Sequence, residues 1–148
     1  MQKEYLSPVG ILTITSDGEH ITEIKYLTTR MIQQCGDAVI RECEKELDAY
    51  FAGKLRDFSV PIKPKGTAFR MKVWEELQRI PYGEVISYKE LAKRIENPAA
   101  VRAVGGANHH NPINIIIPCH RVIGANGKLT GYGGGLDKKE FLLNLERQ

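Results

Sequence analysis

Residues 113–121 have the sequence Ile-Asn-Ile-Ile-Ile-Pro-Cys-His-Arg. The short β-branched run before the proline favours a buried extended segment over a helix. Pro118 ends any hydrogen-bonded ladder and stiffens the backbone in front of Cys119. A thiol reacts as its thiolate, and a neighbouring cation or base lowers its pKa; His120 and Arg121 are adjacent in the sequence. Cys119 is therefore either a reactive nucleophile delivered from the core or an inert buried thiol, and this stretch alone leaves both possibilities open.

The composition is that of a soluble globular protein. The 148 residues allow one domain or one domain with a small appendage, and 42% of them are hydrophobic and 26% charged. No apolar stretch is long enough to span a bilayer, and the first five residues hold no apolar signal core. We therefore expect a cytoplasmic protein with no membrane partner.

Cysteine usage argues against a disulfide scaffold. The chain has three cysteines, an odd and small number that fits a reducing compartment. Cys35 and Cys43 do not form a CxxC pair, and with the four histidines they match no zinc spacing. We expect no metal and no cofactor.

The net charge of +3 is unevenly distributed. Residues 1–60 contain 7 Lys and Arg and 10 Asp and Glu, a net charge of −3, whereas residues 61–148 contain 14 and 8, a net charge of +6. The C-terminal part is therefore the one expected to meet a polyanion. A mixed solvated surface would explain the same numbers.

The first sixty residues are expected to form a small β/α domain. Residues 5–28 carry β-forming residues and two turn signals, which predicts strands. Apolar residues then recur at helical spacing over residues 37–52, with an aspartate as the N-cap. The connection over residues 56–66 is punctuated by two prolines and a glycine, and the charge balance changes sign there. We place the boundary after residue 60, giving domains 1–60 and 61–148.

Two short helices joined by a tight turn are expected over about residues 87–108. Ser87 and Glu90 form a capping box for the first helix, and Asn97-Pro98 begins the second. This is a helix-turn-helix pattern. The second helix is rich in small residues, so its backbone can lie close to a docked surface, and Arg102 would project from it. An ordinary pair of packing helices has the same pattern.

Two further helices flank this region, one over residues 67–79 and one from a capping box at 137–140 to Glu146. Between them, residues 131–135 read GYGGG, a backbone that can pass close to a ligand. This segment lacks the GxGxxG order of a dinucleotide site. Tyr132 inside it favours a docked loop over a flexible linker.

Several motifs follow one another in the C-terminal part: GEVISY at 83–88, RAVGGA at 102–107, Asn111-Pro112, IPCHRV at 117–122, and Tyr132 with GGL at 134–136. In this order they resemble one family, the O6-alkylguanine-DNA alkyltransferases, also called methylated-DNA–protein-cysteine methyltransferases. The resemblance covers about residues 67–146. It implies an α/β (α+β) fold, with a small N-terminal ribonuclease-H-like sheet domain and a mostly helical C-terminal domain that holds the helix-turn-helix.

The resemblance implies a DNA repair protein that acts once. Such a protein flips an O6-alkylated guanine out of duplex DNA and moves the alkyl group irreversibly to its own cysteine. Cys119 matches this acceptor. His120 matches the histidine that helps to form the thiolate through a water, and Glu146 the glutamate that orients the histidine. Asn111 matches the asparagine that ties the DNA-binding motif to the active site. A thiolate suits displacement at an alkyl carbon, and a base within a duplex must be extruded to react.

Other matched positions are implied to contact DNA or the flipped base. Tyr88 matches a tyrosine that promotes flipping, Arg102 an arginine finger that fills the vacated stack, and Tyr132 a pocket residue near the guanine. The remaining matched positions expected at DNA or substrate are Gly105, Gly106, Arg121 and Gly134. The implied partner is double-stranded DNA containing O6-alkylguanine, with O4-alkylthymine left open. No obligate protein partner is expected, and the protein is expected to be a monomer.

Two other functions are compatible with the same residues. A Cys-His-Glu hydrolase would use Cys119 in repeated turnovers and would need an oxyanion hole. A DNA-binding module without chemistry would keep Cys119 as a structural residue. Non-enzymatic relatives carry tryptophan at the acceptor position, so the cysteine argues against this module. Gly133 stands where the best-known vertebrate pattern has a serine that contacts the base, so one contact to O6 is expected to be missing.

Overall fold

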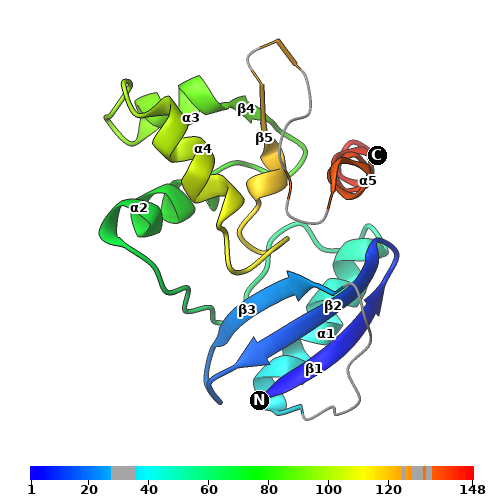
Figure 1. The fold of residues 1–148 in the computed structure, drawn as a ribbon. Coiled ribbons are helices and arrows are strands. Elements are labelled where there is room, and N and C mark those ends of the chain that lie inside the picture. Colours follow the sequence, from blue (N-terminus) through cyan, green and yellow to red (C-terminus); the bar gives the residue numbers. More distant parts are fainter. Residues whose placement is uncertain (28–35, 125, 128–131, 133–134) are drawn as a thin grey trace. The chain divides into compact units, whose positions relative to one another are not determined.

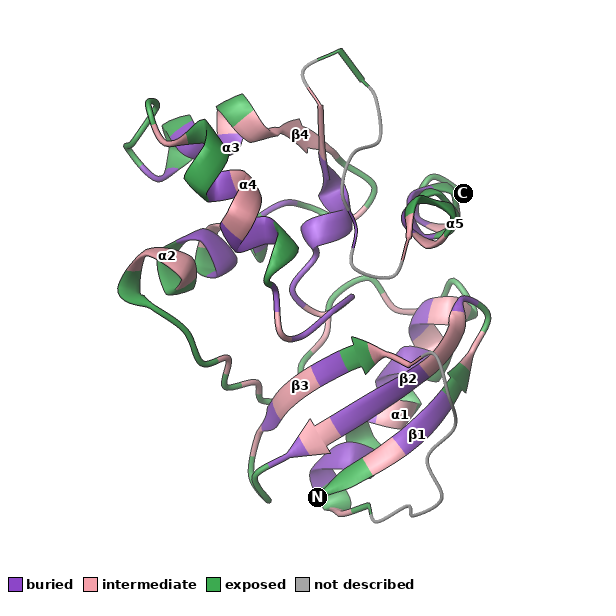
Figure 2. Cartoon of the chain, viewed as in Figure 1, coloured by how far each residue is buried: buried purple, intermediate pink, exposed green. Residues whose placement is uncertain are grey.

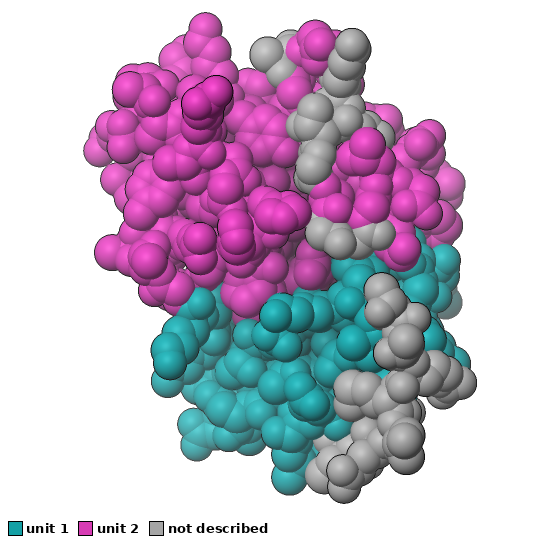
Figure 3. Space-filling view, in the orientation of Figure 1, with its two compact units in different colours: residues 1–65 teal, residues 66–148 magenta. Residues whose placement is uncertain are grey.

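The computed structural model describes residues 1–27, 36–124, 126–127, 132 and 135–148 (Figure 1). The chain divides into two compact units, Met1–Lys65 (unit 1) and Gly66–Gln148 (unit 2) (Figure 3). Unit 1 contains a small sheet and unit 2 is mostly helical, which confirms the expected fold class. None of the helices in the described part of the chain combines the length and hydropathy needed to cross a membrane.

Unit 1 is a three-stranded antiparallel sheet with one helix packed on it (Figure 1). The strands β1 (Gln2–Ser7), β2 (Gly10–Ser16) and β3 (Ile21–Tyr26) are paired in the order β1-β2-β3, and α1 spans Ala38–Phe51. Ile14 and Ile24 are register partners and are fully buried, as are Cys43 and Leu47 of α1. The expected N-cap of α1 is confirmed, because the side chain of Asp37 accepts the N–H of Ile40 at 2.9 Å.

Unit 1 extends beyond the boundary expected after residue 60. The N–H of Ile21 donates to the carbonyl of Pro61, and the N–H of Lys63 donates to the carbonyl of Ile21, both at 2.8 Å. These bonds attach the connecting segment to the edge strand β3. The division between the units therefore falls after Lys65.

Unit 2 is built around three helices that pack on one another, α2 (Ala68–Leu77), α3 (Tyr88–Arg94) and α4 (Val101–His109) (Figure 1). A two-stranded parallel sheet joins β4 (Ile86–Ser87) to β5 (Val122–Ile123). The 3-10 turn η1 (Cys119–Arg121) precedes β5, and α5 (Leu136–Glu146) packs on η1. The helix-turn-helix is therefore formed by α3 and α4.

The two helices of this motif differ in how well the sequence predicts their first residues. Ser87 caps α3 as expected, because its Oγ accepts the N–H of Glu90 at 3.0 Å. The expected start of α4 at Asn97-Pro98 is wrong, since the N–H of Ala100 donates to the carbonyl of Asn97 at 3.0 Å and closes a turn there. Helix α4 begins at Val101 without a side-chain cap.

Trp74 fixes the position of α4. Its indole Nε1 donates to the carbonyl of Ala107 at 2.7 Å, and its ring is buried. A Cβ at Gly66 would lie 2.5 Å from this ring, so only glycine fits at the beginning of unit 2. Helix α4 is thus held by a hydrogen bond as well as by apolar packing.

Candidate active site

The residues that lead to Cys119 form tight turns, so the expected extended segment is wrong. Ile115 has a φ of +73°, and the N–H of Ile116 donates to the carbonyl of Asn114 at 2.9 Å, an i to i+2 hydrogen bond that spans Ile115. This is a γ-turn of the strained, positive-φ kind. Pro118 (φ −82°, ψ 64°) is the central residue of an inverse γ-turn. The N–H of Cys119 closes this turn by donating to the carbonyl of Ile117 at 2.8 Å. Ile113, Ile115 and Ile117 are buried, as they would also be in a buried strand, so their hydrophobicity did not distinguish a strand from these turns.

Asn111 holds these turns together. Its Nδ2 donates to the carbonyl of Ile117 at 2.7 Å, and its Oδ1 accepts the N–H of Ile113 at 2.9 Å. The side chain is buried and lies two residues after the end of α4. Asn111 therefore connects the helix-turn-helix to the segment that carries Cys119.

Cys119 is the first residue of η1 and only 3% exposed. Figure 2 shows how buried and exposed residues are distributed over the elements. Its Sγ lies 3.9 Å from Oδ1 of Asn114, which accepts the thiol hydrogen. Burial raises the pKa of the Cys119 thiol to about 11, although a hydrogen bond from Asn111 and the charge of Lys139 act in the opposite direction. The resting side chain is therefore a thiol that needs a base to become a nucleophile.

His120 and Arg121 both bind the carboxylate of Glu146, the last residue of α5. Nε2 of His120 lies 2.7 Å from Oε2. Nε and Nη2 of Arg121 donate to Oε1 and Oε2 at 2.8 and 3.1 Å, and Nη1 donates to the carbonyl of Ile80 at 2.7 Å. The N–H of Gly83 also donates to Oε1, at 3.3 Å. The carboxylate is thus held by two separate segments of unit 2, the adjacent residues His120 and Arg121 and the backbone at Gly83.

The charges within this cluster determine the state of the histidine. Burial alone would raise the pKa of Glu146, but the hydrogen bonds and charges of His120 and Arg121 outweigh it and hold this pKa far below its usual range. Burial lowers the pKa of His120, which is fully buried, so its imidazole is neutral at neutral pH. An ionised Glu146 can only accept a hydrogen bond, so the proton of the neutral imidazole is on Nε2. Nδ1 is then an acceptor.

Lys139 of α5 is a component of the site that the sequence analysis missed. Its side chain is fully buried, and Nζ donates to the carbonyl of Val122 at 2.6 Å and lies 6.0 Å from the ring centroid of Tyr88. Burial lowers the pKa of Lys139 to about 8, and the Cys119 thiolate opposes this shift. The sequence did contain a signal, because Lys139 shares one helical face with Leu142 and Glu146.

Asn108 was also missed. This residue of α4 is 3% exposed, and its Nδ2 donates to the backbone carbonyl of Cys119 at 3.4 Å. It follows the buried Val104 by one helical turn. A single asparagine in a helix of small residues carries no sequence signal for this contact.

Three residues expected to contact DNA lie on one exposed side of α4. Arg102 is exposed, and Gly105 and Gly106 follow it by three and four residues and are partly exposed. Apart from the neighbouring backbone of α4 itself, a Cβ at either glycine would meet no atom of the described residues within 4 Å. Packing within the protein therefore does not explain these two glycines.

The other expected DNA or substrate residues are placed differently. Tyr88 is partly exposed at the first position of α3, and Tyr132 is 7% exposed. Arg121 was expected among them, but it is 6% exposed and its guanidinium is bonded to Glu146 and Ile80, so it acts inside the protein. Gly134 lies outside the described residues, as does Gly133.

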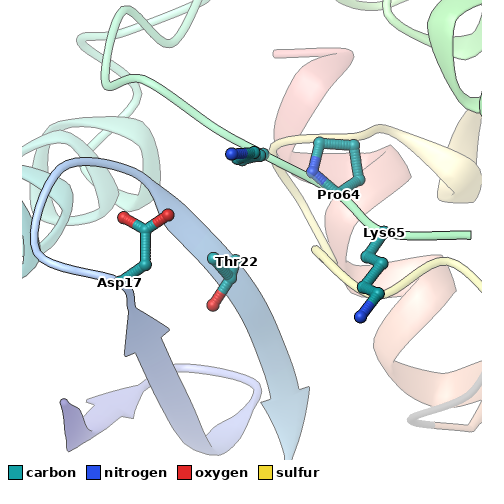
Figure 4. A pocket seen from close by; sticks show the side chains of 5 residues that line it. Asp17, Thr22, Pro64 and Lys65 are labelled. Atoms are coloured by element: carbon teal, nitrogen blue, oxygen red, sulfur yellow. The ribbon is translucent and has the colours of Figure 1, made fainter.

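No expected site residue lines the pocket found in unit 1, which is formed by Asp17, Thr22, Lys63, Pro64 and Lys65 (Figure 4). Over the described ranges, no three His, Cys, Asp or Glu side chains are grouped so that they could hold a metal ion.

Comparison with known proteins identifies both units. Residues 68–148 match a family model described as "6-O-methylguanine DNA methyltransferase, DNA binding domain", and residues 3–64 match "6-O-methylguanine DNA methyltransferase, ribonuclease-like domain". A methylated-DNA–protein-cysteine methyltransferase of Methanosarcina acetivorans is 50% identical over 146 residues, which cover 95% of this chain and 94% of the relative. A Haemophilus influenzae protein of the same name is 49% identical over 150 residues, covering 97% and 84%.

A solved structure supports the same relationship. The crystal structure of Mycobacterium tuberculosis OGT in complex with DNA superposes with a TM-score of 0.91 at 48% identity, covering 99% of this chain and 92% of that chain. The similarity extends over both units, and the family resemblance seen in the sequence is confirmed. This chain belongs to the 6-O-methylguanine DNA methyltransferase family.

Proposed function

We propose that this protein repairs O6-alkylguanine in double-stranded DNA by transferring the alkyl group irreversibly to Cys119. One observation carries the proposal: a buried thiol is followed directly by a histidine that is hydrogen-bonded to an ionised glutamate. This group lies in the unit that matches the family's DNA-binding domain.

In the proposed mechanism, His120 forms the thiolate. Its Nε2–H is bonded to Glu146, so Nδ1 can accept the thiol proton of Cys119 through a water. Glu146 then stabilises the imidazolium that results, and Arg121 keeps Glu146 ionised. The positive charge of Lys139 favours the thiolate over the thiol.

The thiolate then displaces guanine from the alkyl carbon. The sulfur forms a bond to this carbon as the bond from the carbon to O6 breaks, and the electron pair of that bond stays on guanine. Guanine takes up one proton, which balances the proton that Cys119 lost to His120. The product is a thioether, which is not displaced under physiological conditions, so each molecule reacts once. The protein supplies both the nucleophile and its base, and the proposed reaction therefore requires no cofactor and no second protein.

DNA is proposed to bind unit 2 through α4. Residues 66–148 contain 12 Lys and Arg and 8 Asp and Glu, a net charge of +4, which favours contact with phosphates. Gly105 and Gly106 allow the backbone of α4 to approach the duplex closely. Arg102 is exposed on the same side and is proposed to occupy the space of the flipped base. Tyr88 and Tyr132 are proposed to border the extruded nucleotide.

The test is the intact mass of the protein after incubation with a duplex that contains one O6-methylguanine. We expect an increase by one methyl group per protein molecule, stoichiometric with the repaired base. Trypsin releases residues 103–121 as a peptide that contains Cys119 and neither other cysteine, so the modified residue can be assigned. The matched variant Cys119→Ser should bind the duplex and gain no mass.

Other outcomes would replace the proposal. Repair with no mass change and repeated turnovers would indicate a hydrolytic use of Cys119. Retained DNA binding without repair would indicate a module without chemistry. A methyl group found on another cysteine would remove Cys119 from its assigned role.

A further inference from the structure

Two buried side-chain atoms next to Cys119 have no hydrogen-bond partner among the described residues. They are Oδ1 of Asn108 and Nδ1 of His120. The Asn108 amide is bonded to the backbone carbonyl of Cys119, and His120 is the next residue along the chain. Leaving a buried polar atom unpaired is costly, so such atoms in a protein interior normally face a bound group.

The chemistry of the two atoms limits what this group can be. Nδ1 of His120 is an acceptor, because Nε2 carries the proton donated to Glu146. Oδ1 of Asn108 is also an acceptor, and the donor end of this amide is used on the Cys119 carbonyl. Two acceptors cannot bond to each other. A water molecule has two O–H donors, one for each acceptor, and keeps a lone pair for a third group.

The other asparagines near the nucleophile are already used. Both ends of the Asn111 amide are bonded to the backbone of the γ-turn segment. Oδ1 of Asn114 accepts the thiol hydrogen of Cys119. Asn108 is therefore the residue whose acceptor is left for a water at this site.

We propose that Asn108 is a positioning residue, which orients the water through which His120 deprotonates Cys119. This inference rests on the function proposed above. The water donates one O–H to Asn108 Oδ1 and the other to His120 Nδ1, so a lone pair is directed at the thiol, whose hydrogen turns to it from Oδ1 of Asn114. The S–H proton passes to the water oxygen as the water's proton passes to Nδ1, which leaves a thiolate and an imidazolium. Asn108 forms no covalent bond and exchanges no proton.

The test measures how fast iodoacetamide alkylates Cys119 in the full-length protein as a function of pH. The tryptic peptide 103–121 reports Cys119 alone. In Asn108→Leu, which has a similar volume and no polar atom, we expect the rate at neutral pH to fall roughly tenfold, as for the loss of one hydrogen bond. The pH profile should move to higher pH, and the rates should converge at alkaline pH, where the thiolate forms without the relay.

A matched control separates positioning from a loosened helix. Val104 is fully buried one turn earlier in α4, and Val104→Ala removes no polar atom. We expect this variant to be less stable but to keep the wild-type pH profile. The fluorescence of Trp74, which is bonded to the neighbouring Ala107 carbonyl, checks that α4 stays in place. If Asn108→Leu does not fold, Asn108→Ser should show the same alkaline shift.

The inference is overturned if the Asn108 variant keeps the wild-type profile, or if Val104→Ala shifts it equally. Iodoacetamide needs no DNA, so this result is independent of the repair reaction. A wild-type protein that takes no methyl group from DNA refutes the proposed function. A wild-type protein that takes the methyl group, together with an unshifted Asn108 variant, refutes only the role of Asn108.

Discussion

At the scale of single residues, Lys139 provides a direct test of how the nucleophile is activated. Its buried charge lowers the pKa of the Cys119 thiol, against the larger effect of burial. Lys139→Met keeps the length and the apolar stem but removes this charge. We expect the thiol pKa to rise and the reaction of Cys119 with iodoacetamide at neutral pH to slow roughly tenfold, as for a shift of one pKa unit.

Lys138→Met is the matched control for Lys139→Met. It removes the same charge from the neighbouring position of α5, where the side chain is not buried. This variant should react like the wild type. Equal rates for the wild type and Lys139→Met would show that the lysine charge does not act on the thiol.

The sequence predicted some of these residues better than others. Cys119, His120 and Glu146 are assigned through motif positions, and the structure brings them together in unit 2. Asn108 and Lys139 were not predicted, because burial of a polar side chain depends on its tertiary partners. In each case the partner is a backbone carbonyl. A sequence does not show which carbonyl will need a donor.

At the scale of elements, α4 contains two adjacent glycines that no packing contact with another described residue requires. Glycine in a helix interior costs about 0.5–1 kcal/mol relative to alanine. A Cβ at Gly105 or Gly106 would meet no atom of the described residues within 4 Å other than the neighbouring backbone of α4. We therefore expect Gly105→Ala and Gly106→Ala each to raise the free energy of unfolding by up to about 1 kcal/mol, measured by urea unfolding, and to weaken binding to duplex DNA, measured by titration.

The prediction is specific because stability and DNA affinity are expected to change in opposite directions. A substitution that merely damaged α4 would lower both stability and DNA affinity. Ala103→Gly is the reverse control on an exposed position of the same helix, and it should lower stability. If the alanine variants are more stable and bind DNA as tightly as the wild type, the duplex does not approach α4 at these glycines.

The elements that the sequence predicted correctly are those with strong local signals. Ser87 and Asp37 cap their helices because their side chains reach backbone N–H groups only three residues away. The strained turn at Ile115 is the opposite case. A β-branched residue at positive φ is locally unfavourable, and the bonds from Asn111 on either side of it help to hold the backbone there.

At the scale of the whole molecule, the two units meet in the predicted connecting segment, and residues 61–65 of this segment group with unit 1. The prolines and glycine of residues 56–66 predicted a connection, but not that residues 61–63 pair with β3. Backbone pairing of this kind depends on the partner strand and not on the identity of the paired residues. Each unit has its own buried apolar residues.

Acid should destabilise unit 2 because of the buried His120 and Glu146. Burial holds the pKa of His120 in the folded protein below its ordinary value of 6.5, so below that pH the unfolded chain binds more protons than the folded one. Stability is therefore fully present above about pH 6.5 and falls as the pH decreases, by at most about 1.4 kcal/mol per pH unit for one proton. The lowered pKa of Glu146 acts in the same direction, with stability lost as the pH falls through its ordinary value of 4.5.

Trp74 allows this loss to be measured, since it is the chain's single tryptophan and belongs to unit 2. Urea unfolding followed by its fluorescence between pH 8 and pH 5 should give a free energy of unfolding that declines below pH 6.5. His109→Asn removes an exposed histidine and should leave this decline unchanged. His120→Asn should be less stable at pH 8 but should show a shallower decline, because the group that takes up the proton on unfolding is gone. Equal slopes in His120→Asn and the wild type would mean that the buried histidine is not neutral in the folded protein, and the proposed base for Cys119 would then already carry its proton.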